Sequence, residues 1–285
     1  MKFVETVTKD GLILQGLLCE PKKKSKKAIL QIHGMSGNFF ENDMIKPMLY
    51  DYPKNGITFL TVEQRGSELI RWFETKSGKI KLIGSANEKF EDSYYDIDAW
   101  VKFLKKQGYT QIYISAHSLG PTKVVYYMNK TKEKIKGLIF ISPSDMYGLV
   151  LNKKIYPKYQ KSLKEAKKLI GQKKPNQMLS EKLWDFYMLS AKTFLSLFDN
   201  KNTSVFNYFK PELGFNGLNK IEVPVLAFFG TKDDGVVTDP YEASDLLKKN
   251  LVKCPKYTGI VYKGAKHGFE GFENKIVKRV LNFVK

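Results

Sequence analysis

Three histidines occur in this chain of 285 residues, and each lies in a short motif that also contains glycine or serine. They are His33 in IHGM, His117 in AHSLG and His267 in GAKHG. The imidazole is the side chain whose ordinary pKa suits a general base near neutral pH, so a hydroxyl nucleophile here has three candidate partners. We expect His33, which ends a predicted strand, and His117 to have structural roles, and His267 to be the base.

Ser118 is the candidate nucleophile because of the turn in which it lies. It follows a buried strand predicted for residues 112–116 and precedes a helical run at 124–128. Such a tight strand-to-helix turn brings neighbouring backbone close together, which explains the small residues Ala116 and Gly120 on either side. The turn should present the hydroxyl at the carboxyl edge of a sheet.

The AHSLG motif around Ser118 resembles the nucleophile elbow of the α/β-hydrolase superfamily, with alanine in place of the first glycine of G-x-S-x-G. The resemblance covers nearly the whole chain from Leu12 onward, apart from a long insertion, and looks most like carboxylesterases, feruloyl-type esterases and serine-aminopeptidase-like lipases. It implies the chain order serine, acid, histidine, which Ser118, an aspartate and His267 satisfy.

Two aspartates follow the penultimate predicted strand, Asp233 and Asp234. In the family the acid commonly stands three residues after the strand-ending glycine, here Gly230, so the resemblance selects Asp233. Asp234 remains an alternative. Asp145 is another, because it follows the neighbouring strand and could reach the histidine as the acid of some lipases does.

A tetrahedral intermediate needs two backbone N–H groups to bind its negative oxygen. One should come from Leu119, directly after the nucleophile. The other should come from Met35, because the segment HGMSG at 33–37 resembles the oxyanion loop of the family.

The segment EQRG at 63–66 resembles the family's loop often written D-x-R-G. We expect it to be architectural. Arg65 would pair with a carboxylate, and Gly66 would adopt an unusual backbone angle.

These residues need a sheet to position them, and the chain contains apolar runs of strand length separated by helical or irregular segments. Strands that alternate with helices favour right-handed crossovers and a mostly parallel sheet, so the fold class is α/β, and the resemblance specifies an α/β-hydrolase fold. A hairpin closed by Asp10-Gly11 precedes it. The predicted strands are 4–8 and 12–18 in the hairpin, then 28–32, 57–62, 112–116, 138–142, 223–229 and 259–262.

Three helices have recognisable ends or faces. A capping box at 85–88 predicts a helix start, and Gly108 its end. Asp239-Pro240 predicts the start of another helix. Apolar positions between 276 and 284 give the last helix a face that packs on the sheet.

The stretch between Ser142 and Val223 is far longer than a simple crossover, so we expect an inserted cap at 145–220, with 1–144 and 221–285 as the core domain. One amphipathic helix is predicted at 159–170 and a second, rich in aromatics, at 181–198. Side chains of the cap could form a substrate pocket, and the candidates are Trp184, Tyr187, Met188 and Phe194.

The formal net charge is +19, and the only arginines are Arg65, Arg71 and Arg279. Nucleic-acid recognition favours the planar fork of arginine, whereas lysines spread through every segment give diffuse attraction. We therefore expect a solvated lysine-rich surface and no nucleic-acid partner.

No run approaches the length of a spanning helix, and the N-terminus has no signal-peptide pattern, so we expect a cytoplasmic protein without stable membrane insertion. Cys19 and Cys254 have no metal-ligand or CxxC spacing and are expected to be small buried residues. Neither a metal nor an organic cofactor is implied, and the oligomeric state stays open.

These features predict a serine hydrolase that cleaves small to medium acyl or aromatic carboxylic esters through an acyl-enzyme. A serine nucleophile argues against chemistry in which a carboxylate attacks. An acyltransferase or thioesterase on the same triad, or a catalytically silent hydrolase fold that binds a ligand, remain the alternatives.

Overall fold

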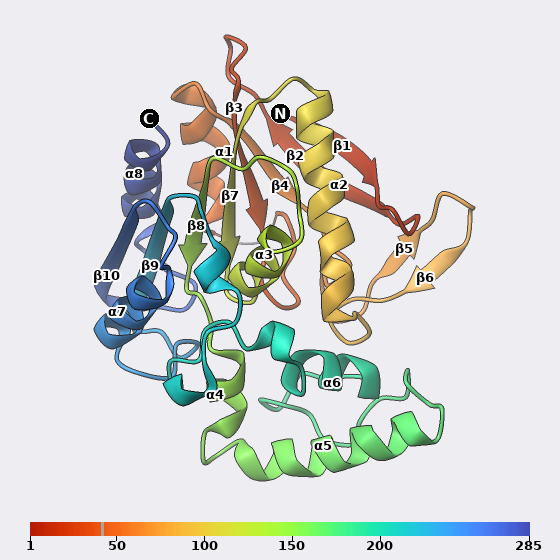
Figure 1. Cartoon of the computed structure of the whole chain (residues 1–285). Coiled ribbons are helices and arrows are strands. Elements are labelled where there is room, and N and C mark those ends of the chain that lie inside the picture. The colour runs from red at the N-terminus through yellow and green to blue at the C-terminus, as the bar shows by residue number, and fades with distance from the viewer. Residues whose placement is uncertain (41–42) are drawn as a thin grey trace.

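The computed structural model describes residues 1–40 and 43–285, and a mostly parallel sheet lies at its centre (Figure 1). β1 (Lys2–Val7) and β2 (Ile13–Cys19) form an antiparallel hairpin, and β2 pairs antiparallel with β4. The other six strands run parallel in the order β4-β3-β7-β8-β9-β10. They are β3 (Lys27–Ile32), β4 (Thr58–Val62), β7 (Gln111–His117), β8 (Gly137–Ile141), β9 (Val225–Lys232) and β10 (Tyr257–Lys266).

The predicted hairpin and all six predicted parallel strands are confirmed. The φ of +88° at Gly11 is the left-handed geometry that favours glycine in the hairpin turn. The small antiparallel pair β5 (Trp72–Glu74) and β6 (Ile80–Leu82) was not predicted, because three-residue strands leave too short a pattern.

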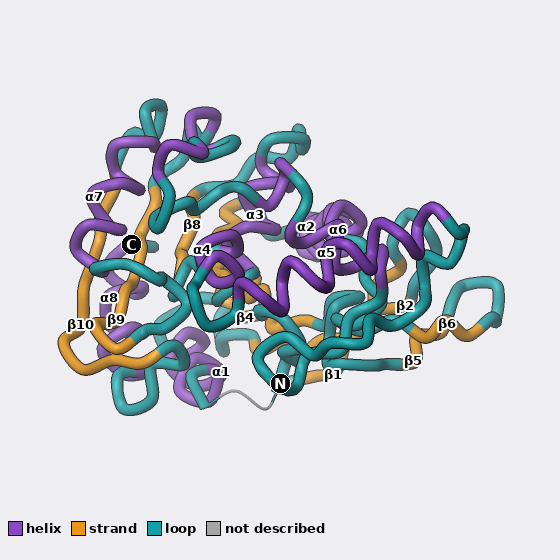
Figure 2. Tube along the Cα trace, turned by 90° about the horizontal axis from the view of Figure 1, so that it is seen from below, coloured by secondary structure: helices purple, strands orange, loops and turns teal. Residues whose placement is uncertain are grey.

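Helices cover both faces of the sheet, as Figure 2 shows. α1 (Ile45–Lys54) and α8 (Glu273–Phe283) pack on one face over residues such as Phe59 and Phe228. α2 (Ser93–Lys106), α3 (Gly120–Met128) and α7 (Pro240–Asn250) pack on the other, around Trp100 and Phe140. The central strands β3, β4 and β8 are therefore almost entirely buried, as expected for a parallel sheet covered on both faces.

A helical segment connects β8 to β9 and lies beyond the carboxyl ends of the parallel strands (Figure 1). It contains α4 (Met146–Leu151), α5 (Tyr156–Gly171) and α6 (Ala191–Phe198). An apolar cluster joins it to the sheet layer, with Leu119 and Tyr126 packed against side chains of α5 and α6. The domain boundaries at 145 and 220 stay a prediction.

Two predicted helices begin later than the sequence indicated. Residues 85–87 form a turn and α2 begins at Ser93, and no capping box forms, since the Ser85 N–H donates to the Glu68 carbonyl and the Glu88 carboxylate binds Lys123. In the aromatic-rich stretch only α6 is helical. Trp184 and Asp185 have φ of +50° and +65°, which a right-handed helix does not allow.

The EQRG loop has a structural role, as predicted, but the reason for glycine at position 66 differs from the prediction. Arg65 is buried and pairs with Asp96 at 2.8 Å and Asp10 at 3.0 Å. Gly66, however, has no left-handed φ, so the expectation of an unusual angle was wrong. A Cβ at Gly66 would lie 2.4 Å from Oε1 of Glu88, so glycine is needed there for close approach.

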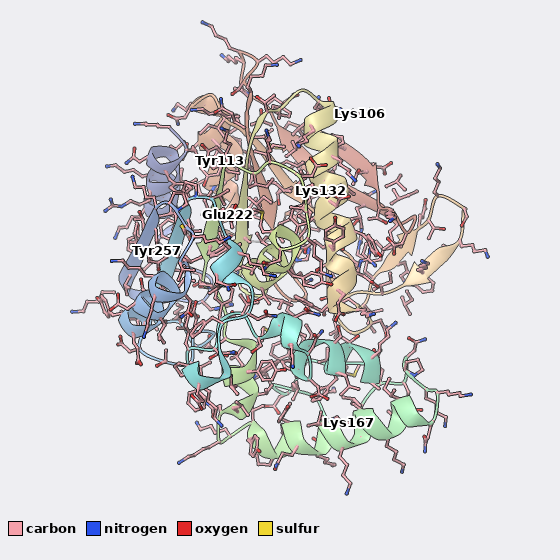
Figure 3. All side chains as sticks on the ribbon, in the orientation of Figure 1. Lys106, Tyr113, Lys132, Lys167, Glu222 and Tyr257 are labelled. Atoms are coloured by element: carbon pink, nitrogen blue, oxygen red, sulfur yellow. The ribbon has the colours of Figure 1, made fainter. Side chains whose placement is uncertain are left out.

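Lysine side chains project from many parts of the surface, and Figure 3 labels Lys106, Lys132 and Lys167 on three separate segments. All three are exposed. Lys123 is different, because its side chain is fully buried. Among the helices of the described residues, none combines the length and the apolar character needed to cross a bilayer.

Candidate active site

Ser118 lies in the turn between β7 and α3, with a left-handed φ of +60°. Its backbone N–H donates to the Ile141 carbonyl at 3.0 Å, which fixes the strained turn to β8. The small residues around it are needed sterically. A Cβ at Gly120 would lie 2.9 Å from the Ile32 carbonyl oxygen, and one at Gly34 would lie 2.6 Å from the Ser118 Cβ.

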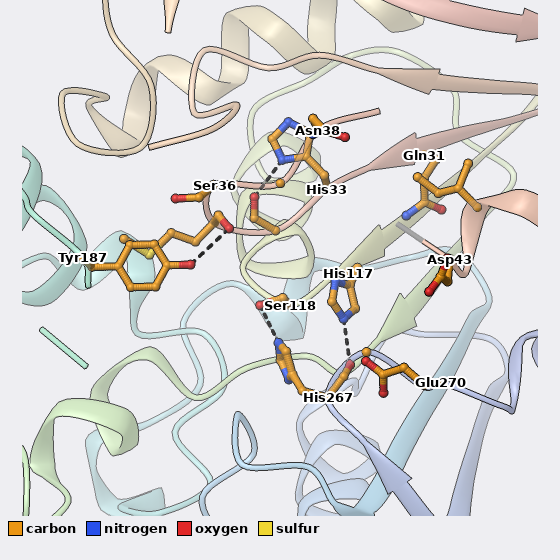
Figure 4. Close-up of a pocket in the computed structure, with 15 residues that line it drawn as sticks. Gln31, His33, Ser36, Asn38, Asp43, His117, Ser118, Tyr187, His267 and Glu270 are labelled. Carbon is orange, nitrogen blue, oxygen red and sulfur yellow. Dashed lines mark hydrogen bonds between the residues drawn. The ribbon is translucent and has the colours of Figure 1, made fainter. Parts of the chain in front are cut away.

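His267 follows β10, and its ring lies between Ser118 and Asp233. The Ser118 hydroxyl donates to Nε2 at 2.8 Å, and Nδ1–H donates to the Asp233 carboxylate at 2.7 Å (Figure 4 shows the serine contact). The His267 carbonyl accepts from the Ser142 hydroxyl and from Nε2–H of His117, each at 2.9 Å. Both the ring and the backbone of His267 are therefore held in place.

The electrostatics of the pair suit a neutral base beside an ionised acid. Burial alone would raise the pKa of Asp233, but the hydrogen bond and charge of His267 outweigh it and hold the pKa below its usual range. Burial lowers the pKa of His267. The hydrogen bond and charge of Asp233, with the charges of Asp234 and Glu270, outweigh it and hold that pKa above its ordinary value.

The two alternative acids lie in other environments. Asp234 is exposed and lines a cavity near His267, but its carboxylate makes no hydrogen bond to the ring among the described residues. Asp145 caps α4 and accepts from the backbone N–H groups of Gly148 at 2.6 Å and Phe209 at 2.8 Å. Burial raises the pKa of Asp145 to about 6 despite these bonds.

The two candidate oxyanion donors flank the nucleophile. Leu119 follows Ser118 directly, and Met35 follows Gly34, whose backbone packs against the Ser118 side chain. Within the described residues, neither the Met35 nor the Leu119 N–H has a hydrogen-bond acceptor. Both residues line a cavity that reaches Ser118. The catalytic roles of all five residues stay a prediction.

One cavity at Ser118 is mainly apolar and has a volume of about 270 Å³. Of the predicted pocket residues, Trp184 and Tyr187 line it, whereas Phe194 is fully buried in the packing of α6. Met188 is not among the described residues that line it. Helical spacing could not separate these roles, because most of this stretch is not helical. Further lining residues that the sequence did not single out are Met146, Leu149 and Ser144.

A second cavity, about 440 Å³ in volume, also reaches Ser118 and is more polar than the first, so we call it the polar cavity. Its lining includes Gln31, Asp43 and Glu270 together with His33 and His117 (Figure 4). Burial lowers the pKa of His33 to about 3 and that of His117 to about 4, so both rings are neutral near pH 7. The motifs that contain His33, Ser118 and His267 all contribute to this lining, whereas no motif pointed to Gln31, Asp43 or Glu270.

The hydroxyl of Tyr187 donates to the Met35 carbonyl at 3.4 Å and links the helical segment to the candidate oxyanion loop. This contact joins positions that are 152 residues apart, so the sequence carried no signal for it. The structural roles expected of His33 and His117 fit their contacts. His33 donates to the Gly34 carbonyl at 2.7 Å and accepts from the Ser67 hydroxyl at 2.8 Å.

Asp233, Asp234 and His267 also bring one potential metal-ligand atom each within 4.8 Å of one another. The ring nitrogens of His267 are already engaged, one with Asp233 and the other with Ser118. A direct 2.7 Å hydrogen bond between ring and carboxylate leaves no room for an ion between them. The donor set fits proton transfer better than metal binding.

Several solved structures have the same fold as this chain. Est1E from Butyrivibrio proteoclasticus with ferulic acid bound superposes with a TM-score of 0.66 at 21% identity, over 98% of this chain and 97% of that one. An esterase of Pyrococcus furiosus gives 0.62 at 20%, over 99% and 89%. A monoacylglycerol lipase of Paleococcus ferrophilus gives 0.63 at 19%, over 95% and 98%. At these identities the likeness shows the fold, which confirms the predicted α/β-hydrolase architecture.

No curated protein matches the sequence. One protein family, described as "Protein of unknown function (DUF1749)", matches residues 84–285. This match covers more than half of the chain and includes Ser118, Asp233 and His267. The chain therefore belongs to the DUF1749 family and has an α/β-hydrolase fold.

Proposed function

We propose that this protein is a serine hydrolase that cleaves carboxylic esters through an acyl-enzyme intermediate. The observation that carries the proposal is the continuous chain of hydrogen bonds from the Ser118 hydroxyl through His267 to the buried Asp233 carboxylate. The names of the fold neighbours, which include an esterase, a lipase and a ferulate complex, support esters as the substrate class.

The proposed reaction has two halves. Ser118 Oγ attacks the ester carbonyl carbon while its proton passes to Nε2 of His267, and the N–H groups of Met35 and Leu119 bind the oxyanion. The bond to the alcohol breaks as His267 returns the proton to the departing oxygen. Water then loses a proton to His267 and attacks the acyl carbon, and His267 returns that proton to Ser118 Oγ as the acyl–oxygen bond breaks and the acid leaves. Asp233 keeps Nδ1 protonated and stabilises the imidazolium in each half.

We further propose that residues 145–220 are a cap over this site and that the apolar cavity receives the acyl group. Trp184 and Leu149 of the helical segment line it together with Met35 and Leu119, so the acyl group would be enclosed between cap and core. A cavity of about 270 Å³ suits small to medium acyl or aromatic groups.

The test is a series of p-nitrophenyl esters of increasing acyl length with wild type, Ser118→Ala and His267→Ala. Each variant should lose at least about 10⁴-fold in kcat, because serine and histidine act as a unit. Ser144→Ala is the matched comparison, since its hydroxyl lies 3.5 Å from Ser118 Oγ but, among the described residues, makes no hydrogen bond to the His267 ring. A fluorophosphonate should label Ser118. Turnover retained in Ser118→Ala would refute the assignment.

A further inference from the structure

Two cavities meet at Ser118 and differ in the chemistry of the residues that line them. The apolar cavity is lined by Leu119, Met146, Leu149 and Trp184, whereas the polar cavity is lined by Gln31, Asn38, Asp43 and Glu270. Ser118, Met35, Tyr187 and His267 line both. An ester held at Ser118 has two ends, so the acyl end and the alcohol end meet different surroundings.

The polar cavity lies where three segments meet: the end of β3, the residues before α1 and the loop after His267. Figure 4 shows Asp43 and Glu270 near one another on the side of His267 away from Tyr187, with Gln31 beyond them. An alcohol oxygen that takes its proton from Nε2 of His267 leaves close to this space.

Gln31 is the buried polar group of the cavity. Its side chain is 2% exposed, and its Nε2 group donates to the Ile32 carbonyl at 3.4 Å. The amide oxygen Oε1 is buried and has no hydrogen-bond partner among the described residues. A buried acceptor without a partner costs free energy, and a ligand that donates a hydrogen bond would recover it.

Glu270 adds a full negative charge at the mouth of the cavity. It is exposed, and within the described part of the chain it has no ion-pair partner. Its carboxylate lies close to the backbone of Gly268, which follows His267: a Cβ added at Gly268 would be 2.2 Å from Glu270 Oε1. Asp43 contributes less, since Lys46 binds it at 2.6 Å.

The absence of cations from the lining contrasts with the rest of the molecule. Lysine and arginine make up 48 of the 285 residues, yet none is among the described residues that line either cavity. With His33 and His117 neutral, the unpaired formal charge among the described lining residues of the polar cavity is that of Glu270, because Lys46 compensates Asp43. An anionic leaving group would therefore be repelled at short range, although the whole protein would attract it from a distance.

We propose that the polar cavity receives the leaving alcohol and selects one that donates hydrogen bonds or carries a positive charge, and that has no negative charge. A polyol donates through hydroxyl groups to Gln31 Oε1 and Glu270, and an alcohol that bears an ammonium group pairs with the carboxylates. This inference rests on the proposed ester hydrolysis at Ser118. It excludes coenzyme A thioesters and phosphate-bearing alcohols as good substrates.

The experiment uses four esters of one acyl group, butyrate, with glycerol, choline, 2-hydroxyethanesulfonate and n-propanol as alcohols. Each kcat/KM is divided by the rate of the same ester in hydroxide, which removes differences in intrinsic reactivity. We expect the glycerol and choline esters to exceed the propyl ester by about tenfold, the size of one net hydrogen bond or ion pair in a partly open site. The sulfonate ester should be the poorest. The glycerol ester tests hydrogen-bond donation without a charge, and the choline ester tests a positive charge without hydrogen-bond donation.

Glu270→Lys should raise the relative rate of the sulfonate ester and lower that of the choline ester. The matched control is Glu222→Lys, which changes the net charge equally but lies before the start of β9, at the opposite end of the strands (Figure 3). Gln31→Met should lower the glycerol-to-propyl ratio and leave the choline-to-propyl ratio in place. Because Gln31 is buried, thermal unfolding of this variant is measured alongside.

The outcomes separate the inference from the proposed function. Hydrolysis that depends on Ser118, with the sulfonate ester as good as the glycerol ester and no response to Glu270→Lys, would overturn the leaving-group inference alone. An equal response to Glu222→Lys would do the same, because it would assign the effect to net charge. No turnover of any ester and no fluorophosphonate label at Ser118 would overturn both proposals.

Discussion

Nδ1 of His267 lies 2.7 Å from Oδ1 of Asp233, whose side chain is fully buried. The same carboxylate oxygen accepts the backbone N–H of Gly235 at 2.9 Å. Gly235 also packs on the histidine, since a Cβ there would lie 2.7 Å from the His267 ring. The turn after β9 therefore positions the acid and limits the movement of the ring at once.

Asp233→Asn should reduce kcat by roughly three to four orders of magnitude, because an amide in place of the carboxylate stabilises the wrong histidine tautomer. Asp234→Asn should cost far less, since its carboxylate makes no bond to the ring. Asp145→Asn should act mainly on stability through the cap of α4 and the Phe209 N–H. Steady-state rates, with circular dichroism to verify folding, check all three. A larger rate loss in Asp234→Asn than in Asp233→Asn would assign the acid to Asp234.

The pH dependence of kcat/KM should follow the neutral form of His267, which accepts the serine proton. Because the pKa of His267 lies above its ordinary value of 6.5, activity should rise with pH through a midpoint above 6.5 and then level off. Asp234→Asn removes a negative charge that raises this pKa, so its midpoint should move to lower pH. A midpoint that stays in place, or moves upward, in Asp234→Asn would contradict this account.

Much of the candidate site was predictable because its residues follow strand ends. Ser118, Asp233 and His267 stand after β7, β9 and β10, and parallel strands bring such positions to one edge of the sheet. The buried strands could also be predicted, because each is a run of apolar residues in the sequence. The structure adds that His267 lies within hydrogen-bond distance of both Ser118 and Asp233, which spacing along the chain does not specify.

The parts that the sequence did not reveal depend on tertiary contacts. Residues 85–88 have the residue types of a capping box, but in the folded protein the Glu88 carboxylate is buried and binds Lys123. Gln31 reads as one more residue of a buried strand, and only the cavity beside it gives its amide oxygen a possible role. Which face of a segment meets a cavity, as for Tyr187 and Phe194, also requires the packing of the whole chain.

Gly34→Ala should abolish most of the activity while the protein stays folded. A Cβ at this position would lie 2.6 Å from the Ser118 Cβ and 3.1 Å from its Oγ, so the nucleophile or the Met35 N–H must move. A displacement of about 1 Å can cost on the order of 10²-fold in rate. Gly171→Ala is the control, because a Cβ there meets no atom within 4 Å. Normal rates of fluorophosphonate labelling and ester turnover in Gly34→Ala would refute the close approach.

Lys123 and Glu88 form a buried ion pair in which each charge compensates the other, so the loss of either partner should destabilise the protein strongly. Both side chains are fully buried, with Nζ 2.8 Å from Oε2, and the Glu88 backbone carbonyl also accepts from the Thr193 hydroxyl of α6. Lys123→Met leaves the Glu88 carboxylate buried without its cation, and the free energy of unfolding in urea should fall by about 3–5 kcal/mol.

The double variant with Lys123→Met and Glu88→Met removes both charges and should regain much of that loss, because two apolar side chains of similar volume need no compensation. An exposed pair offers the matched control. Lys253 and Glu222 are 2.9 Å apart with side chains 60% and 67% exposed, so Lys253→Met should change the unfolding free energy by less than about 1 kcal/mol. If the losses of Lys123→Met and Glu88→Met, each measured as a single variant, simply add in the double variant, the two charges are not coupled and this account of the ion pair is wrong.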